Sequence, residues 1–226
     1  MADGPTYRVL LTGATGFAGG AVLRQCLKDA RILRVLTLGR RHVDTDDPRL
    51  TQIVHGDFND LSPIAEHFQG LDALFFCLGI SQSDVPDERR YREITYSYTM
   101  EIAGRLKEGS PDAVFHFLSG AGTKVDGRFM WARVKGETER DLTGMGLGGT
   151  VHYRPGLVFG SGDEKPRYRT EGYLRPFQPF FRGFRGISIR AEEFGQAMLQ
   201  AMIEGLKAGT LENRDLRALA ERYPVP

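Results

Sequence analysis

Three closely spaced glycines near the start of the chain limit its possible folds more than any other feature. Residues 7–12 (YRVLLT) form an apolar run of strand length, the sequence GATGFAG follows, and a helical pattern extends over residues 17–29. In such a strand–loop–helix unit Gly13 permits a tight turn, Gly16 lets the backbone approach a pyrophosphate, and Gly19 lets the helix pack closely on the sheet. The positive end of the helix also favours phosphate. The motif predicts a dinucleotide-binding loop, with a ligand-free glycine-rich turn as the alternative.

Strand-like and helix-like segments alternate along the rest of the chain. We expect strands over residues 35–38, 51–55, 73–78, 113–118 and 151–154, and helices over residues 61–68, 88–108, 129–145 and 191–206. Several of these strands are apolar throughout, which is typical of a parallel sheet covered on both faces. The chain has no internal repeat and no linker with a shift in composition. We therefore expect one α/β domain over residues 1–226, a doubly wound parallel sheet of the Rossmann type with a small C-terminal substrate lobe.

Composition excludes several classes of protein. The chain has 226 residues, enough for a sizeable core, and its net charge of +1 gives no electrostatic reason for nucleic-acid binding. No apolar run approaches the roughly 20 residues of a membrane-spanning helix, and the first residues show no signal-peptide pattern. The two cysteines, Cys26 and Cys77, lack metal-ligand spacing. We expect a cytoplasmic monomer or homodimer that binds a small-molecule substrate and no nucleic acid, membrane or metal.

Two arginines stand where the second strand is expected to end. An acidic residue at this point would bind the ribose 2′-hydroxyl of NAD, but the chain has Gly39, Arg40 and Arg41. Guanidinium groups suit a 2′-phosphate, so the pattern favours NADP over NAD. The alternative is two solvated arginines in a chain that is rich in arginine.

Asp57 follows the third expected strand and precedes Phe58. Its carboxylate could accept a hydrogen bond from the adenine amino group of a bound dinucleotide. Alternatively, it caps the turn that follows.

The order of motifs resembles a known superfamily. The chain contains TGxxGxxG, GRR, GDF, FFCLG, FLSGAG, WxxxK and RPG in this sequence. This order resembles the short-chain dehydrogenases/reductases, and most closely their atypical branch related to the Tat-interacting protein CC3 and to NAD-dependent epimerase-like proteins. The segments 154–156, 164–167 and 211–213 are those that narrow the resemblance to this branch.

The resemblance implies roles for individual residues. Ser119 would polarise the substrate, Lys135 would bind the nicotinamide ribose, and the segment around Cys77 would pass along the cofactor. Together with the loop and strand ends, the expected cofactor contacts are Gly13, Thr15, Gly16, Phe17, Gly19, Arg40, Arg41, Asp57, Phe58, Leu78, Gly79, Lys135, Pro155 and Gly156.

The resemblance implies a catalytic tyrosine four positions before the lysine, and this chain lacks it. The residue four positions before Lys135 is Trp131, and an indole N–H does not exchange its proton at any useful pH. Ser119, Lys135 and Trp131 are therefore the expected active-site residues, without the usual acid. The groups that could replace the phenol are Tyr96, Tyr98, Tyr153, Tyr168 and His116, although packing is the ordinary role of each.

Basic and aromatic residues alternate over residues 165–190. In the fold implied by the resemblance, this region shapes the substrate pocket, so we expect a lid over residues 160–190. Core packing with surface arginines is one alternative, and contact with nucleic acid or a membrane surface is another.

The sequence as a whole predicts an NADP-dependent oxidoreductase-like enzyme for a small organic substrate. Reduction of a C=C or C=N bond, or an internal redox isomerisation, could proceed without the tyrosine. The alternative is a catalytically silent NADP-binding sensor or scaffold protein.

Overall fold

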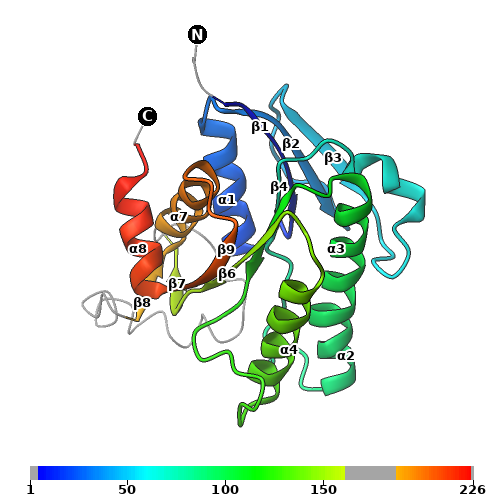
Figure 1. Ribbon diagram of the computed structural model, residues 1–226, viewed down its shortest axis with the longest axis vertical. Coiled ribbons are helices and arrows are strands. Elements are labelled where there is room, and N and C mark those ends of the chain that lie inside the picture. Colours follow the sequence, from blue (N-terminus) through cyan, green and yellow to red (C-terminus); the bar gives the residue numbers. More distant parts are fainter. Residues whose placement is uncertain (1–4, 161–186, 225–226) are drawn as a thin grey trace.

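Seven parallel strands form the main sheet in the computed structural model, which describes residues 5–160 and 187–224 (Figure 1). The strands are β1 (Tyr7–Thr12), β2 (Ile32–Gly39), β3 (Leu50–Val54), β4 (Ala73–Phe76), β5 (Val114–Leu118), β6 (Gly149–Arg154) and β9 (Ala208–Glu212). Their order is β3-β2-β1-β4-β5-β6-β9, and every neighbouring pair is parallel. The expected α/β class with a Rossmann-type parallel sheet is confirmed.

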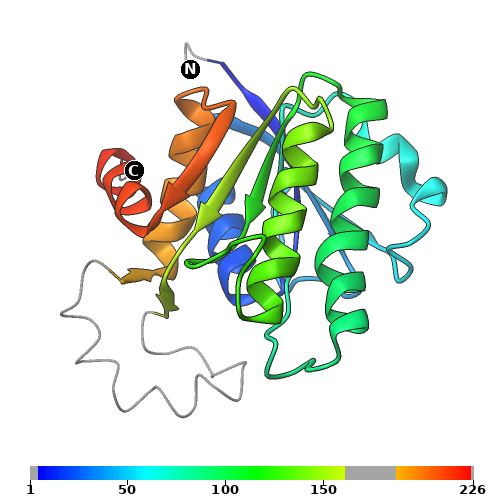
Figure 2. The ribbon, with the colours of Figure 1, turned by 60° about the horizontal axis from the view of Figure 1, so that its bottom comes forward.

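Helices cover both faces of this sheet (Figure 2). One layer contains α1 (Phe17–Lys28), α7 (Ala191–Ile203) and α8 (Asn213–Arg222), and the other contains η1 (Ser62–Phe68), α2 (Glu88–Arg92), η2 (Glu93–Ser97), α3 (Tyr98–Gly109) and α4 (Met130–Gly144). Alternate residues of β1 enter different cores: Val9 and Leu11 pack toward α1, whereas Leu10 packs toward α3. Burial on both faces explains why these strands are apolar throughout.

The strand order reverses between β1 and β4, and the glycine loop lies at this point. The chain proceeds from β1 through β2 to β3 on one side and from β4 onward on the other. Open α/β sheets bind ligands at the carboxyl ends of strands at such a switch point. Gly13 has φ +72°, and a Cβ there would lie 2.4 Å from the carbonyl oxygen of Cys77. Only glycine therefore fits between the ends of β1 and β4.

The structure corrects several expected elements. The helix expected over residues 88–108 is divided into α2 and α3 by the π-helical turn η2, and the helix over 61–68 is the 3-10 helix η1. The sequence did not predict β9, α8 or the two-stranded parallel sheet of β7 (Leu157–Phe159) and β8 (Ser188–Arg190). These strands have three to five residues, and β9 is mostly exposed, so none of them produces an apolar run of the usual strand length.

Some expectations lie wholly or partly outside the described residues. Most of the lid expected over residues 160–190 falls on residues 161–186, which the structure does not describe. Segment 164–167 and Tyr168 belong to these residues. The assignment of residues 1–226 to one domain therefore stays a prediction. Among the helices that the structure describes, none has the length and apolarity needed to cross a membrane.

Candidate cofactor and active site

The start of α1 presents backbone amides to the space above the glycine loop. Gly16 is the N-cap residue, no side chain caps this end, and the first turn has no acidic residue. Gly16 itself donates a hydrogen bond to the carbonyl of Gly13 (2.8 Å), which closes the turn. A Cβ at Gly19 would lie 2.2 Å from the same carbonyl oxygen, so glycine is required where the helix meets the loop. This geometry suits an anionic group at the helix start.

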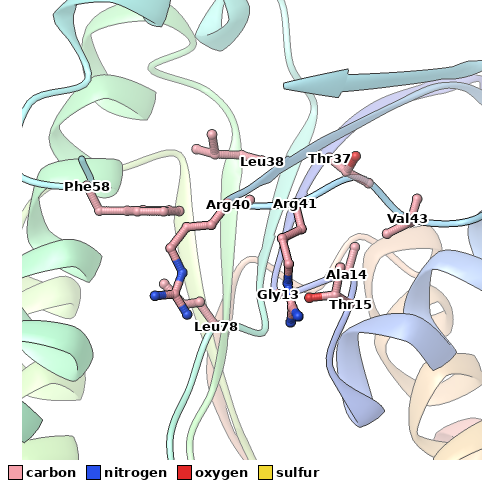
Figure 3. A pocket seen from close by; sticks show the side chains of 11 residues that line it. Gly13, Ala14, Thr15, Thr37, Leu38, Arg40, Arg41, Val43, Phe58 and Leu78 are labelled. Carbon is pink, nitrogen blue, oxygen red and sulfur yellow. The ribbon is translucent and has the colours of Figure 1, made fainter. Parts of the chain in front are cut away.

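A pocket lies between the glycine loop and the end of β2 (Figure 3). Six of the predicted cofactor residues line it, namely Gly13, Thr15, Arg40, Arg41, Phe58 and Leu78. The wall also includes Thr37 and Leu38 of β2 and Val43 from the loop after it, which belong to no sequence motif and were not predicted. Segments from β1, β2 and β4 thus converge on one space.

Arg40 and Arg41 direct positive charge toward the glycine loop. Both side chains are exposed, and within the described residues neither guanidinium forms an ion pair or hydrogen bond with the protein. In Figure 3 the guanidinium of Arg40 lies near Leu78, whereas that of Arg41 lies near Gly13 and Thr15. Their charge is available for an anion in this region.

Asp57 and Phe58 have structural contacts of their own. Oδ1 of Asp57 accepts a hydrogen bond from the backbone N–H of Asn59 (2.9 Å), so the carboxylate caps this turn, and its contact with adenine stays a prediction. Phe58 is buried and stacks on the ring of Tyr98, with ring centroids 5.4 Å apart. Phe58 therefore forms a fixed apolar wall of the pocket.

Lys135 and Ser119 meet at the end of β5. Nζ of Lys135, on α4, donates hydrogen bonds to the backbone carbonyls of Ser119 (2.8 Å) and Leu118 (3.4 Å). Burial lowers the pKa of Lys135 to about 8, and the negative charge of Glu139 opposes this shift. Glu139 itself pairs with Arg154 at the end of β6. The lysine is thus fixed to the end of β5.

Thr123 orients the hydroxyl of Ser119, which is buried. The oxygens of the two hydroxyls are 3.0 Å apart, and Thr123 donates its own hydrogen to the carbonyl of Gly120 (2.8 Å). Ser119 must therefore be the donor in the contact between the two hydroxyls, because each hydroxyl has a single hydrogen. The sequence analysis missed Thr123, and its spacing of four residues from Ser119 in a loop gives no signal.

Trp131 packs over the loop that follows β5. A Cβ at Gly120 or Gly122 would lie 3.8 Å or 3.6 Å from the indole ring. The backbone N–H of Trp131 faces Oε1 of Gln82 at 3.4 Å. The indole therefore covers the loop next to Ser119, one helical turn before Lys135.

The described groups that could replace the missing phenol all have other partners. Tyr96 donates a hydrogen bond to Asp141 (2.9 Å), and Tyr98 contacts Phe58. Tyr153 and His116 are fully buried in the sheet and hydrogen bond to each other (2.7 Å). Burial lowers the pKa of His116 to about 3 and raises that of Tyr153, so neither exchanges protons near neutral pH.

The remaining predicted cofactor residues lie at the start of α1, after β4 and after β6. Phe17 begins α1, and Gly79 is exposed with open space around it. Pro155 is buried and accepts a hydrogen bond from Ala121 (2.9 Å), while Gly156 donates to Oδ1 of Asn213 (3.1 Å). Within the described ranges, no three His, Cys, Asp or Glu side chains gather to form a metal site.

Comparison with known proteins identifies the class to which this fold and site belong. The NAD dependent epimerase/dehydratase family matches residues 9–123, and the chain belongs to this family. It is 26% identical over 220 residues to the protein fmp52, mitochondrial, of Aspergillus niger, covering 94% of this chain and 84% of that protein. It is 24% identical over 196 residues to FMP52, mitochondrial, of Saccharomyces cerevisiae, covering 83% of this chain and 84% of that protein.

Solved structures with the same fold include nicotinamide-cofactor enzymes. DesIV, a dTDP-glucose 4,6-dehydratase from Streptomyces venezuelae with NAD and TYD bound, has a TM-score of 0.71 at 17% identity and covers 94% of this chain and 80% of its own. MoeE5 in complex with UDP-glucuronic acid and NAD has a TM-score of 0.70 at 17% identity, and the match covers 91% of this chain and 75% of the MoeE5 chain. The family match, together with this shared fold, confirms the recognised superfamily, and this chain has the fold of NAD(P)-binding oxidoreductase-type enzymes.

The expected cytoplasmic location is wrong. Relatives from Aspergillus niger, Eremothecium gossypii, Saccharomyces cerevisiae and Aspergillus fumigatus are all named mitochondrial proteins. The expectation rested on composition and on the absence of a secretion signal, and neither property distinguishes a cytoplasmic protein from one imported into an organelle.

Proposed function

We propose that this protein is an NADP-dependent oxidoreductase that acts on a small organic substrate without the usual catalytic tyrosine. The observation that carries the proposal is the pair of cations, Arg40 and Arg41, which line one pocket with Gly13 and Thr15 and have no protein partner within the described residues. Charge-assisted contacts of this kind contribute roughly 1.5–3 kcal/mol each. The residues directly at the end of β2 are Gly39, Arg40 and Arg41, where an acidic residue would favour NAD.

The residues present fit a nicotinamide dinucleotide. The uncapped start of α1 and the bare backbone at Gly16 would hold the pyrophosphate. Phe58 and Leu78 form an apolar wall beside the arginines, and Lys135 with Ser119 forms the polar end of the site. When bound, the cofactor supplies hydride transfer, while these residues hold and orient it.

Calorimetric titration of NADPH and NADH tests the cofactor preference. We expect the parent protein to bind NADPH at least about tenfold more tightly. The combined variant Arg40→Ala and Arg41→Ala should lose this preference and keep its affinity for NADH. Equal affinities in the parent, or an unchanged preference in the variant, would contradict the proposal.

Trp131 also favours a second candidate function, an NADP-occupied sensor or scaffold without turnover. The indole supplies no proton, and the described tyrosines have other hydrogen-bond or packing partners. A screen of carbonyl, enone and imine compounds with NADPH distinguishes the two functions. Loss of nicotinamide absorbance with any class supports the enzyme, whereas tight binding without turnover across all classes supports the sensor.

A further inference from the structure

A second hollow adjoins the pocket around the glycine loop. Its walls are the first turns of α1 and the chain from Arg41 to Thr45. Among the residues that the structure describes, the charged or titratable side chains in its wall are Arg24, Arg41, His42 and Asp44. Arg41 and Thr15 line both spaces, whereas Arg40 lines only the first. Of the two arginines after β2, Arg41 is thus the one that faces α1.

Arg24 reaches this hollow because of its direction along α1. Side chains on a helix lean toward its N-terminus, and Arg24 is an exposed residue one turn after Gly20. A Cβ at Gly20 would lie 3.6 Å from Nη1 of Arg24. The guanidinium therefore lies against the first turn of α1, on the side of the glycine loop that faces Arg41.

The charges around the hollow favour an anion. Within the described part of the chain, two guanidiniums and the His42 imidazole share the wall with one carboxylate, that of Asp44. The positive end of α1 adds to this field. A phosphate would gain from these cations, whereas an uncharged hydroxyl would gain little, so the hollow can distinguish phosphorylated from unphosphorylated ligands.

We propose that Arg24 is a specificity-determining residue that, together with Arg41, binds the 2′-phosphate of the adenosine ribose. The inference rests on the proposed function, because it requires a dinucleotide at the glycine loop. Arg40, which lines the first pocket but not the hollow, then adds its charge to the field around the phosphate, while Arg24 and Arg41 form the direct contacts. Sequence position alone would have assigned both Arg40 and Arg41 to the phosphate.

Asp44 provides an independent test of the same site. Its carboxylate repels a phosphate in the hollow and could accept a hydrogen bond from an unphosphorylated ribose. Asp44→Asn should therefore increase affinity for the phosphorylated ligand by about threefold, the size expected for an exposed charge pair. Affinity for the unphosphorylated ligand should stay equal or fall.

The experiment uses adenosine 2′,5′-bisphosphate and adenosine 5′-monophosphate, which differ only in the 2′-phosphate. Their affinities are measured calorimetrically for the parent and for Arg24→Gln, Arg24→Lys, Arg41→Gln and Asp44→Asn. Lys28→Gln is the matched control, since Lys28 is an exposed cation one turn further along α1 that does not line the hollow. Thermal unfolding of each variant checks its fold.

We expect Arg24→Gln to weaken binding of the bisphosphate by about tenfold and to change binding of the monophosphate by less than about twofold. Arg24→Lys should lose less, and Lys28→Gln should match the parent. A bisphosphate affinity that depends on Arg41 but not on Arg24 would overturn the inference and leave NADP dependence standing. Equal losses for both ligands in Arg24→Gln would overturn it as well. Equal affinities for both ligands in the parent would instead reject NADP preference itself.

Discussion

Nζ of Lys135 donates a hydrogen bond to the backbone carbonyl of Ser119 at 2.8 Å, which ties α4 to the end of β5. This contact holds three features of the site in one place: the buried Ser119 hydroxyl, the ammonium group, and the Trp131 indole one turn earlier on the helix. The lysine therefore has a structural role whether or not it also contacts a cofactor.

The lowered pKa of Lys135 predicts a pH-dependent stability. Its pKa is about 8 in the folded protein against 10.5 ordinarily, so folding disfavours the charged lysine below pH 8. This penalty disappears as the pH rises from about 8 to 10.5. Urea unfolding of the parent and Lys135→Met should show the parent gaining stability relative to the variant over this interval. A difference that stays constant with pH would show that the lysine titrates normally.

Trp131 should form an apolar wall of the site and take no part in proton transfer. We expect Trp131→Phe to keep most of any native activity and to lose about 1–2 kcal/mol of packing or hydrogen bonding. Trp131→Tyr should restore the tyrosine–lysine pair and produce weak carbonyl reductase activity, measured by NADPH absorbance. A Trp131→Phe protein that folds, binds NADPH and is inactive would instead assign an electrophilic role to the indole N–H.

Two glycines of the loop should have different roles: Gly16 should contact the ligand, whereas Gly19 lets α1 pack against the loop. Gly16 has extended backbone angles that other residues adopt, and a Cβ there would lie 3.0 Å from the Gly13 carbonyl oxygen, whereas a Cβ at Gly19 would lie 2.2 Å from it. We expect Gly16→Val to fold, with a smaller loss of unfolding temperature than Gly19→Ala, but to lose cofactor binding. Gly19→Ala should lower the unfolding temperature. If Gly16→Val binds NADPH as well as the parent, the loop does not hold the pyrophosphate.

His116 should destabilise the fold in acid. Burial lowers its pKa to about 3 from 6.5, and its Nε2 has no hydrogen-bond partner among the described residues. The unfolded chain takes up this proton first, so stability falls by up to about 1.4 kcal/mol per pH unit between pH 6.5 and 3. Tyr153→Phe should keep this slope, and the double variant with His116→Phe should reduce it. Identical slopes in the two variants would exclude His116 as the source.

The central strands could be predicted because a strand that is buried on both faces has apolar residues at every position. The run at residues 73–78 contains β4, and the run at 113–118 contains β5. The shortest strands could not be predicted in this way, since β7 and β8 have three residues each. The π-helical turn η2 was also hidden, because one turn of wider helix barely changes the periodicity of the segment 88–108.

Residues of the candidate site could be predicted where a motif requires a particular backbone conformation. Gly13 illustrates this, because its positive φ and its contact with Cys77 exclude any side chain. Arg24 and Thr123 carry no such signal, since their importance comes from what lies opposite them in the fold. Sequence could not decide whether Asp57 caps a turn or contacts adenine. Its hydrogen bond with the backbone N–H of Asn59 shows that it caps the turn.

The pairing of β7 with β8 has a consequence for how such a protein can diversify. Leu157 pairs with Ser188, and the Asn213 side chain joins Gly156 to the carbonyl of Ser188. The chain therefore leaves and re-enters this part of the fold at neighbouring points fixed by backbone hydrogen bonds. Doubling the length of sequence between such points costs only about 0.6 kcal/mol in closure entropy. A change in the length of that sequence therefore leaves the pairing of β7 with β8 in place.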